Sequence, residues 1–280
     1  MQKVVSVTDM RLLAAHQKKT GKTVALVPTM GALHAGHAAL IGMAEASAEI
    51  VVVSAFVNPL AFGPSENFAA YPRSPDADLK LCEELRVDAL FVPSAEEIFP
   101  RGHSTTVNEE SVSKPLCGVS RPAHFRGVTT AMAKLLNIVR PDVLVLGQKD
   151  AQRVAVVRKM IADLHFGVEV IVVPTVRETD GLAVDVHNRD LTASQRQDAL
   201  SLHAALECAK TMVAQGVRST DRIIAEATHI LGQRRRVRVI YVSIVDPTTI
   251  EPMREVVPGR TLLAIAAWID EVRLIDNTLL

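Results

Sequence analysis

The chain has 280 residues, 48% of them hydrophobic and 22% charged, a composition typical of a globular protein with one large domain or two smaller ones. Its 31 basic and 31 acidic residues give a formal net charge of zero, which argues against the positive field that broad nucleic-acid binding requires. Its three cysteines lack metal-ligand spacing and no apolar run reaches the ~18 residues that span a bilayer, so we expect a cytoplasmic protein without a zinc site or a membrane segment.

Short apolar runs alternate with longer helical segments through the first part of the chain. The runs predicted to be strands are Val24–Val27, Ile50–Val57, Ala89–Val92, Val143–Leu146 and Val168–Val173. The segments predicted to be helices are Thr8–Lys18, His37–Ala48, Asp76–Glu84, Val128–Val139 and Ala151–Leu164. Because the strands are continuous apolar runs, both of their faces should be buried in a parallel sheet. The alternation predicts an open α/β sheet in a first domain that spans residues 1–174.

The character of the sequence changes after Val173. A polar loop follows and contains the turn signal Asp180-Gly181. The elements predicted beyond it are a helix from Thr192 to Ala214, a helix at Thr220–Leu231, and strands at Val237–Val245, Thr261–Trp268 and Arg273–Ile275. They predict a small α+β domain over residues 175–280. Two long loops of the first domain, Pro64–Pro75 and Ser104–Phe125, are expected to lie over a binding site as lids.

The run Pro28-Thr29-Met30-Gly31-Ala32-Leu33-His34-Ala35-Gly36-His37 lies where the first predicted strand ends and a helix begins. A helix N-terminus attracts phosphate, and two imidazoles beside it add donors that can follow charge developing on a phosphoryl group. The chain lacks a Gly-x-x-x-x-Gly-Lys loop, and the run is of the His-x-Gly-His type found in nucleotidyl-transfer enzymes. Two alternatives remain open: ordinary surface or core histidines, or zinc ligands, although the scattered cysteines argue against zinc.

Polar side chains follow several of the predicted strands. His34 and His37 come after the first strand, Asn58 after the second, and Lys149 and Asp150 after a later one. Ligands of open α/β sheets bind at the carboxyl ends of the strands. The sequence therefore predicts a ligand site at this edge of the sheet.

A set of motifs occurs in a fixed order along the chain. They are Met30–His37, Phe56-Val57-Asn58-Pro59, Tyr71-Pro72-Arg73, Phe125-Arg126-Gly127-Val128, Gly147-Gln148-Lys149-Asp150, Asp180-Gly181-Leu182-Ala183 and Ala266-Ala267-Trp268. With them the chain resembles the pantoate–β-alanine ligase family from near residue 1 to Asn277. The resemblance implies a Rossmann-like parallel sheet of the nucleotidyl-transfer type and a homodimer formed through the first domain. It also implies a reaction that uses ATP and Mg²⁺: pantoate is activated as an acyl adenylate, and β-alanine then forms an amide and releases AMP.

The same resemblance assigns roles to individual residues. The catalytic residues would be His34, His37 and Lys149. The nucleotide would be bound by Met30, Gly31, His34, His37, Gly147, Lys149, Asp150, Val176, Val184, Asp185, Val186 and His187. The small acid and amine substrates would be bound by Asn58, Ala61 and Arg153. Asp150 would orient Lys149 or bind the ribose, and no residue is assigned as a protein ligand of a metal.

The chain departs from the family pattern at several of these positions. The family has glutamine at Ala61 and Arg153, Ser-Ser-Arg at Asp185-Val186-His187, and Glu-Asp at Glu66-Asn67. Arg153 adds a charge that suits a carboxylate of another substrate. Asp185 puts an anion where triphosphate should approach, which is unfavourable unless Mg²⁺ or another cation intervenes. His187 is a weaker, pH-dependent substitute for arginine, and Arg189 lies two residues further on.

Three interpretations are compatible with these departures. The protein is a pantoate–β-alanine ligase with a rearranged pocket, a paralogue that joins another acid or amine, or a non-catalytic binding protein on the same fold. The survival of His34, His37, Lys149 and Asp150 together weakens the third interpretation, because a protein without catalysis has no chemical reason to keep them.

Overall fold

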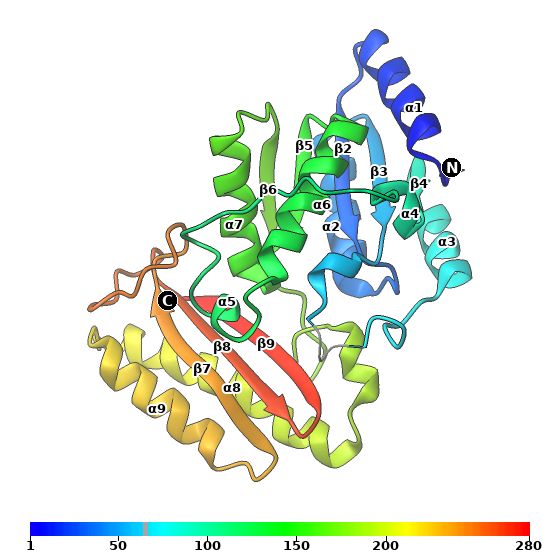
Figure 1. Cartoon of the computed structure of the whole chain (residues 1–280). Helices are drawn as coiled ribbons and strands as arrows, with labels where there is room; N and C mark the ends of the chain where they lie inside the picture. The colour runs from blue at the N-terminus through cyan, green and yellow to red at the C-terminus, as the bar shows by residue number, and fades with distance from the viewer. Residues whose placement is uncertain (64–66) are drawn as a thin grey trace. The chain divides into compact units, whose positions relative to one another are not determined.

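The computed structural model describes residues 1–63 and 67–280, which form two compact units (Figure 1). Unit 1 comprises Met1–Gly147 and Val156–Val173, and unit 2 comprises Gln148–Ala155 and Pro174–Leu280. The domain boundary between residues 174 and 175 stays a prediction. Pro64 of the first predicted lid loop and Glu66 lie outside the described residues. Within the described ranges, no helix is long and apolar enough to cross a membrane.

Unit 1 is built on a six-stranded sheet whose paired strands are all parallel, in the order β1-β4-β3-β2-β5-β6. Its strands are β1 (Gln2–Val4), β2 (Val24–Thr29), β3 (Ile50–Ala55), β4 (Ala89–Phe91), β5 (Val143–Gly147) and β6 (Glu169–Val173). The predicted open parallel sheet is confirmed, and β2 and β3 are buried nearly throughout, as continuous apolar runs require. The prediction missed β1, which is three residues long and exposes Gln2 and Lys3.

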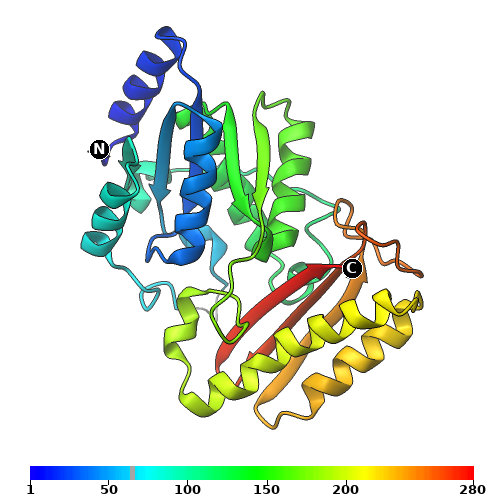
Figure 2. The ribbon, with the colours of Figure 1, turned by 180° about the vertical axis from the view of Figure 1, so that it is seen from behind.

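Helices cover both faces of this sheet. The helices of this part of the chain are α1 (Val7–Lys19), α2 (Ala35–Ser47), α3 (Pro75–Glu84), α4 (Ala95–Ile98), α5 (Cys117–Ser120), α6 (His124–Val139) and α7 (Ala151–Asp163). Helix α6 lies in front of the sheet in Figure 1, whereas α2 lies in front of it in Figure 2, where the molecule is seen from behind. The predicted loop Ser104–Phe125 contains the four-residue helix α5, which is too short to leave a periodic signal in the sequence.

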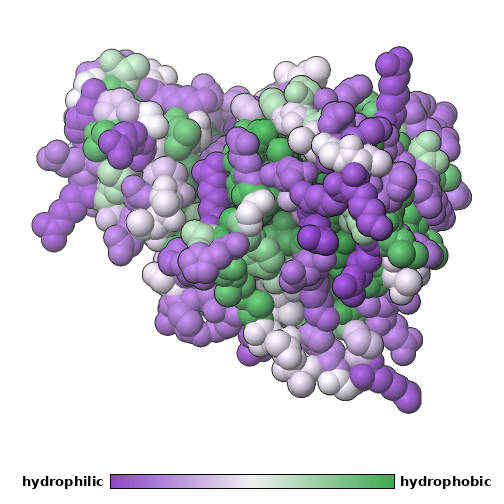
Figure 3. Space-filling model, turned by 90° about the horizontal axis from the view of Figure 1, so that it is seen from above, coloured by the Kyte–Doolittle hydropathy of each residue, from purple (hydrophilic) through white to green (hydrophobic). Residues whose placement is uncertain are grey.

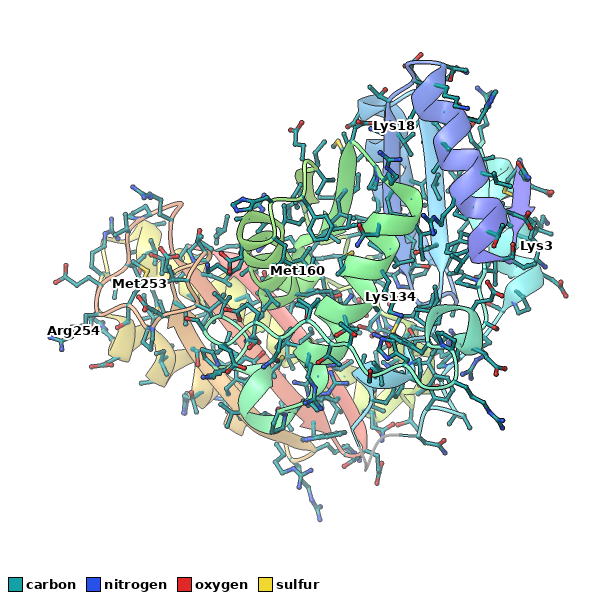
Figure 4. The ribbon with its side chains drawn as sticks, turned by 45° about the horizontal axis from the view of Figure 1, so that its top comes forward. Lys3, Lys18, Lys134, Met160, Met253 and Arg254 are labelled. Carbon is teal, nitrogen blue, oxygen red and sulfur yellow. The ribbon has the colours of Figure 1, made fainter. Side chains whose placement is uncertain are left out.

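One carboxylate ties the starts of several of these elements together. Asp142, just before β5, accepts a hydrogen bond from the backbone N–H of Val24 at the start of β2 (2.9 Å). Its other oxygen pairs with the Nζ of Lys18 on α1 (2.5 Å), a residue labelled in Figure 4. Burial acts to raise the pKa of Asp142, but Lys18 and the Val24 N–H outweigh it and lower that pKa. The contacts of Asp142 therefore hold β2 and β5 in register at their amino ends.

Strands β2 and β5 form the switch point of the sheet. β2 pairs with β3 on one side and with β5 on the other, so the connections from this pair leave in opposite directions. In such sheets a crevice opens at the carboxyl ends of the two strands, where ligands bind. Those ends are Thr29 and Gly147, and the segments that follow them are the loop after β2 and the turn after β5.

Unit 2 has a three-stranded antiparallel sheet with two helices on one face (Figure 2). The strands are β7 (Val237–Val245), β8 (Leu262–Ile269) and β9 (Val272–Leu279), and the helices are α8 (Ala193–Ala214) and α9 (Thr220–Gly232). Helix α8 starts with a capping box between Thr192 and Gln195. Leu202 and Leu206 of α8 belong to one hydrophobic core with Leu263 and Ile265 of β8. The predicted small α+β fold is confirmed, although β9 extends well beyond Arg273–Ile275.

Candidate active site

Helix α2 begins with two histidines that bind each other's backbone. It starts at Ala35 with His34 as its N-cap, two residues before the predicted start at His37. The Nδ1 of His34 accepts from the N–H of Gly36 (3.1 Å), and the Nδ1 of His37 accepts from the N–H of His34 (3.2 Å). The rings lie 4.0 Å apart between centroids. Because each Nδ1 is an acceptor, the ring hydrogen sits on Nε2, and two neutral imidazoles can donate from Nε2 at the positive end of α2.

Gly36 lies between the two histidines for a steric reason. A Cβ atom built at this position would lie 2.9 Å from Cε1 and 3.0 Å from Nδ1 of the His34 ring. Real Cβ contacts are not that short, so any larger residue would push the His34 ring off the helix terminus. The glycine of the His-x-Gly-His pattern is therefore part of the site's geometry.

The turn that precedes His34 is held by a buried carboxylate that the sequence analysis did not single out. Asp78, in the first turn of α3, is 6% exposed, and its two oxygens accept from the N–H groups of Ala32 (2.9 Å) and Leu33 (2.7 Å). Gly31 and Ala32 both have positive φ angles, +80° and +50°, which is an unusual conformation for alanine. Asp78 therefore stabilises the backbone that carries His34. Its only signal in the sequence is an acidic residue on the inward face of a predicted helix.

Asn58 follows β3, and its side chain is bound within the protein. It is 6% exposed and caps the short helix η1 (Pro59–Ala61), with Oδ1 accepting from the N–H of Leu60 (3.1 Å). Its Nδ2 donates to the carbonyl oxygen of Gly127 on α6 (2.9 Å). A Cβ at Gly127 would lie 2.1 Å from the carbonyl oxygen of Leu60, so only glycine permits this approach. We interpret Asn58 as a residue that fastens η1 to α6.

Ala61 is buried at the end of η1, and its backbone is bound by two side chains that the sequence analysis did not assign. Its carbonyl oxygen accepts from Nη2 of Arg121 (3.0 Å) and lies 2.8 Å from Nδ1 of His124. Arg121 lies just before α6, and His124 is the first residue of that helix. At the position where the resemblance implies a glutamine side chain, the backbone carbonyl oxygen of Ala61 takes part in hydrogen bonding.

In unit 2, Lys149 and Asp185 form a largely buried ion pair. Lys149 lies in the short helix η2 (Gln148–Asp150) directly after β5, and Asp185 caps the short helix η3 (Val186–Asp190). Their side chains are 20% and 17% exposed, and Nζ of Lys149 contacts Oδ2 of Asp185. The other oxygen of Asp185 accepts from the N–H of His187 (2.9 Å). Both carboxylate oxygens therefore have partners within the protein.

The two members of this pair shift each other's proton affinity. Burial acts to raise the pKa of Asp185, but the charge of Lys149 and the hydrogen bond from His187 outweigh it and lower that pKa to about 2. Burial acts to lower the pKa of Lys149, but the charges of Asp185 and then Asp150 outweigh it and raise that pKa. Both groups are therefore ionised at neutral pH. The cation expected to face Asp185 is a residue of the protein itself.

Arg153 and His187 each contact an acidic side chain of the protein. Arg153 pairs with Asp150 (Nη1 to Oδ2, 2.8 Å), so its charge is matched by the carboxylate expected to orient Lys149 or bind ribose. Nδ1 of His187 lies 3.4 Å from Oδ2 of Asp190, and the His187 side chain is 41% exposed. The exposed Arg189 donates from Nε to the carbonyl oxygen of Val186 (2.9 Å), one turn back in the same short helix.

The candidate residues therefore fall into two groups. Unit 1 holds Met30, Gly31, His34, His37, Asn58, Ala61 and Gly147. Unit 2 holds Lys149, Asp150, Arg153, Val176, Val184, Asp185, Val186 and His187. Asn277 of β9 fixes the Lys149 turn, since its Nδ2 donates to the carbonyl oxygens of Gln148 (3.0 Å) and Lys149 (2.8 Å). In the part of the chain that the structure describes, no three His, Cys, Asp or Glu side chains are grouped to hold a metal ion.

Comparison with known proteins gives consistent results over the whole length of the chain. A family model described as pantoate-beta-alanine ligase matches residues 2–279. The pantothenate synthetase of Thermotoga neapolitana is 45% identical over 280 residues, 100% of both chains. That of Thermoanaerobacter sp. strain X514 is 46% identical over 273 residues, 98% of this chain and 96% of the relative.

Solved structures show the same similarity. A crystal structure of pantothenate synthetase from Thermus thermophilus has 39% identity and a TM-score of 0.94, covering 100% of this chain and 99% of that one. The pantoate–β-alanine ligase of Francisella tularensis, complexed with beta-gamma ATP and β-alanine, has 28% identity and a TM-score of 0.81, covering 100% and 97%.

Proposed function

Since the chain belongs to the pantoate–β-alanine ligase family, we propose that it joins pantoate to β-alanine in two steps that use ATP. In the first step a carboxylate oxygen of pantoate attacks the α-phosphorus of ATP, and the bond to pyrophosphate breaks. In the second step the neutral amine of β-alanine attacks the carbonyl carbon of the adenylate. AMP leaves, and the amine loses a proton as the amide forms.

The observation that carries this proposal is the His34–His37 turn. A carboxylate is a poor electrophile, so it must first be activated by transfer of the adenylyl group, and negative charge builds up on the phosphate oxygens during that transfer. His34 and His37 supply neutral Nε2–H donors at the N-terminus of α2, where the helix dipole also favours an anion. Such donors need no proton transfer, and they strengthen as charge develops.

The other candidate residues take supporting roles in the proposal. Lys149 supplies a compact positive charge for the phosphates. The nucleotide is also bound by Met30, Gly31, Gly147, Asp150, Val176, Val184, Val186 and His187, and Asp185 belongs to the same site as the partner of Lys149. Arg153 and the backbone at Ala61 border the acid substrate, and Asn58 shapes that border by holding η1.

Three further properties belong to the proposal. A Mg²⁺ ion that accompanies ATP would offset charge on the phosphates, and it would need few protein ligands, because such ions use only one or two protein carboxylates and keep several waters. The enzyme works in the cytoplasm as a homodimer. Figure 3 shows one face of the molecule, on which hydrophobic and hydrophilic side chains are interspersed.

The test is pantoate-dependent exchange of radioactive pyrophosphate into ATP, which reports the first step without the amine. We expect exchange with pantoate and none when pantoate is omitted. Small hydroxy, amino and dicarboxylic acids are the matched alternatives. Exchange with one of these acids and none with pantoate would contradict the proposed substrate.

A further inference from the structure

Asp185 is fixed in place on both of its carboxylate oxygens. Oδ1 accepts from the N–H of His187 and so caps η3, and Oδ2 contacts Nζ of Lys149. A side chain that caps a helix cannot rotate away without leaving that N–H unpaired. The negative charge of Asp185 is therefore a permanent part of the surroundings of Lys149.

The backbone at Lys149 is also held by hydrogen bonds. The Nδ2 of Asn277 binds the carbonyl oxygens of both Gln148 and Lys149, and Nε2 of Gln148 donates back to Oδ1 of Asn277 (3.1 Å). These bonds connect η2 to β9 within unit 2. The ion pair therefore joins two backbones that are each supported by hydrogen bonds within the protein.

The charges around Lys149 cancel one another. Lys149 faces Asp185, and Arg153 faces Asp150, so two cations are matched by two anions. An ammonium group has three N–H donors, and the contact with Asp185 uses at least one of them. A phosphate that approaches Lys149 therefore meets fewer donors and a carboxylate close to the lysine.

We propose that Asp185 competes with the phosphates of the nucleotide for Lys149, and thereby weakens the binding of ligands in proportion to their negative charge. This inference rests on the proposed function, in which Lys149 faces the phosphates. Adenosine is uncharged, AMP carries roughly two negative charges at neutral pH, and ATP carries more. Asp185 thus penalises ATP and pyrophosphate more than AMP, and it favours the release of pyrophosphate after the first step.

The experiment compares the dissociation constants of ATP, AMP and adenosine for the full-length protein and for Asp185→Asn, by isothermal titration calorimetry at one ionic strength. Asparagine is also a good N-cap, so this change removes the charge and keeps an acceptor for the His187 N–H. We expect ATP to bind about tenfold more tightly to Asp185→Asn, the order of magnitude for removing one like charge at a partly screened site. AMP should gain less, and adenosine should not change.

Two further variants make the comparison decisive. Asp185→Ser also keeps a capping side chain and should give the same order of effects. Glu207→Gln removes a negative charge from an exposed pair with Lys210 on α8, in the same unit, and should leave all three affinities unchanged. Circular dichroism and a thermal unfolding curve establish that each variant is folded.

Unchanged or weaker ATP binding in both Asp185 variants would overturn the inference, as would an equal gain for adenosine. Pyrophosphate exchange separates this result from the proposed function. If ATP affinity does not respond to Asp185 while pantoate-dependent exchange continues, the inference fails and the function stands. If the charge-dependent gain is seen but no acid supports exchange in the wild-type protein, the inference stands and the proposed reaction fails.

Discussion

Lys149 and Asp185 are each about one-fifth exposed, and each stays charged because the other offsets the cost of its burial. The sequence identified both residues, Lys149 from its place after a strand and Asp185 from its departure from the family pattern. It could not pair them, because their contact depends on how η2 and η3 come together in the folded unit. The same applies to Arg153, whose charge is matched by Asp150 within the protein.

The Asp185 carboxylate predicts a specific acid sensitivity. Its pKa is about 2 in the folded protein against an ordinary value of 3.8, so the folded state binds that proton less readily than the unfolded state. The resulting stability, on the order of 2 kcal/mol, is complete above about pH 4 and is lost as the pH falls through 2. Urea unfolding followed between pH 5 and pH 2 should therefore show a flatter pH dependence for Asp185→Asn than for the wild type. Parallel curves for the two proteins would contradict this assignment.

His37 is expected to act on the chemical step. His37→Ala removes one donor to the developing charge and should lower pantoate-dependent pyrophosphate exchange by roughly 10²–10³-fold. The matched control is His16→Ala, an exposed histidine of α1 in the same unit, which should leave exchange unchanged. Wild-type exchange in His37→Ala would remove the residue from the proposed mechanism.

At the scale of elements, the turn between β2 and α2 depends on α3. Asp78 binds the N–H groups of Ala32 and Leu33, and Ser74 at the N-cap position of α3 donates to Asp78 through its hydroxyl (3.1 Å). The first turn of α3 also favours a negative charge there. An element distant in sequence thus sets the position from which α2 starts.

Asp78→Asn tests that dependence. The amide turns an N–H₂ group toward one of the two backbone N–H groups, so the turn loses an acceptor and His34 shifts. We expect kcat to fall by roughly 10- to 100-fold with little change in the KM for β-alanine, the cost of a small misplacement of a catalytic group. Asp76→Asn makes the same substitution at an exposed position of the same helical turn and should have wild-type kinetics. Equal effects in the two variants would show that the charge of α3, not the turn, matters.

The strands of the parallel sheet could be predicted from the sequence, whereas the start of α2 and the residues that support the turns could not. β2, β3 and β5 were predictable because a strand buried on both faces must be apolar throughout. The start of α2 was misplaced because histidine is not one of the usual N-cap residues, whose side chains bear oxygen. Asp78 and Asn277 could not be identified, because each binds the backbone of a segment far away in sequence.

At the scale of the whole molecule, the prediction is a homodimer formed through the first domain. Multi-angle light scattering on the purified protein should give about twice the chain mass of 30.3 kDa at micromolar concentration. A single species of 30.3 kDa over a wide concentration range would contradict it. The net charge of zero removes a long-range repulsion that would otherwise oppose association.

The bonds from Asn277 to the Lys149 turn also bear on how the protein is synthesised. A ribosome adds Lys149 128 residues before it adds Asn277, which binds the Lys149 carbonyl oxygen. While it is still being translated, the nascent chain can pair β2 with β3 and β5. The turn after β5 lacks its hydrogen bonds from Asn277 until β9 has been made. The backbone at Lys149 therefore acquires this support only after 128 further residues have been added, when the strands of the second unit can form.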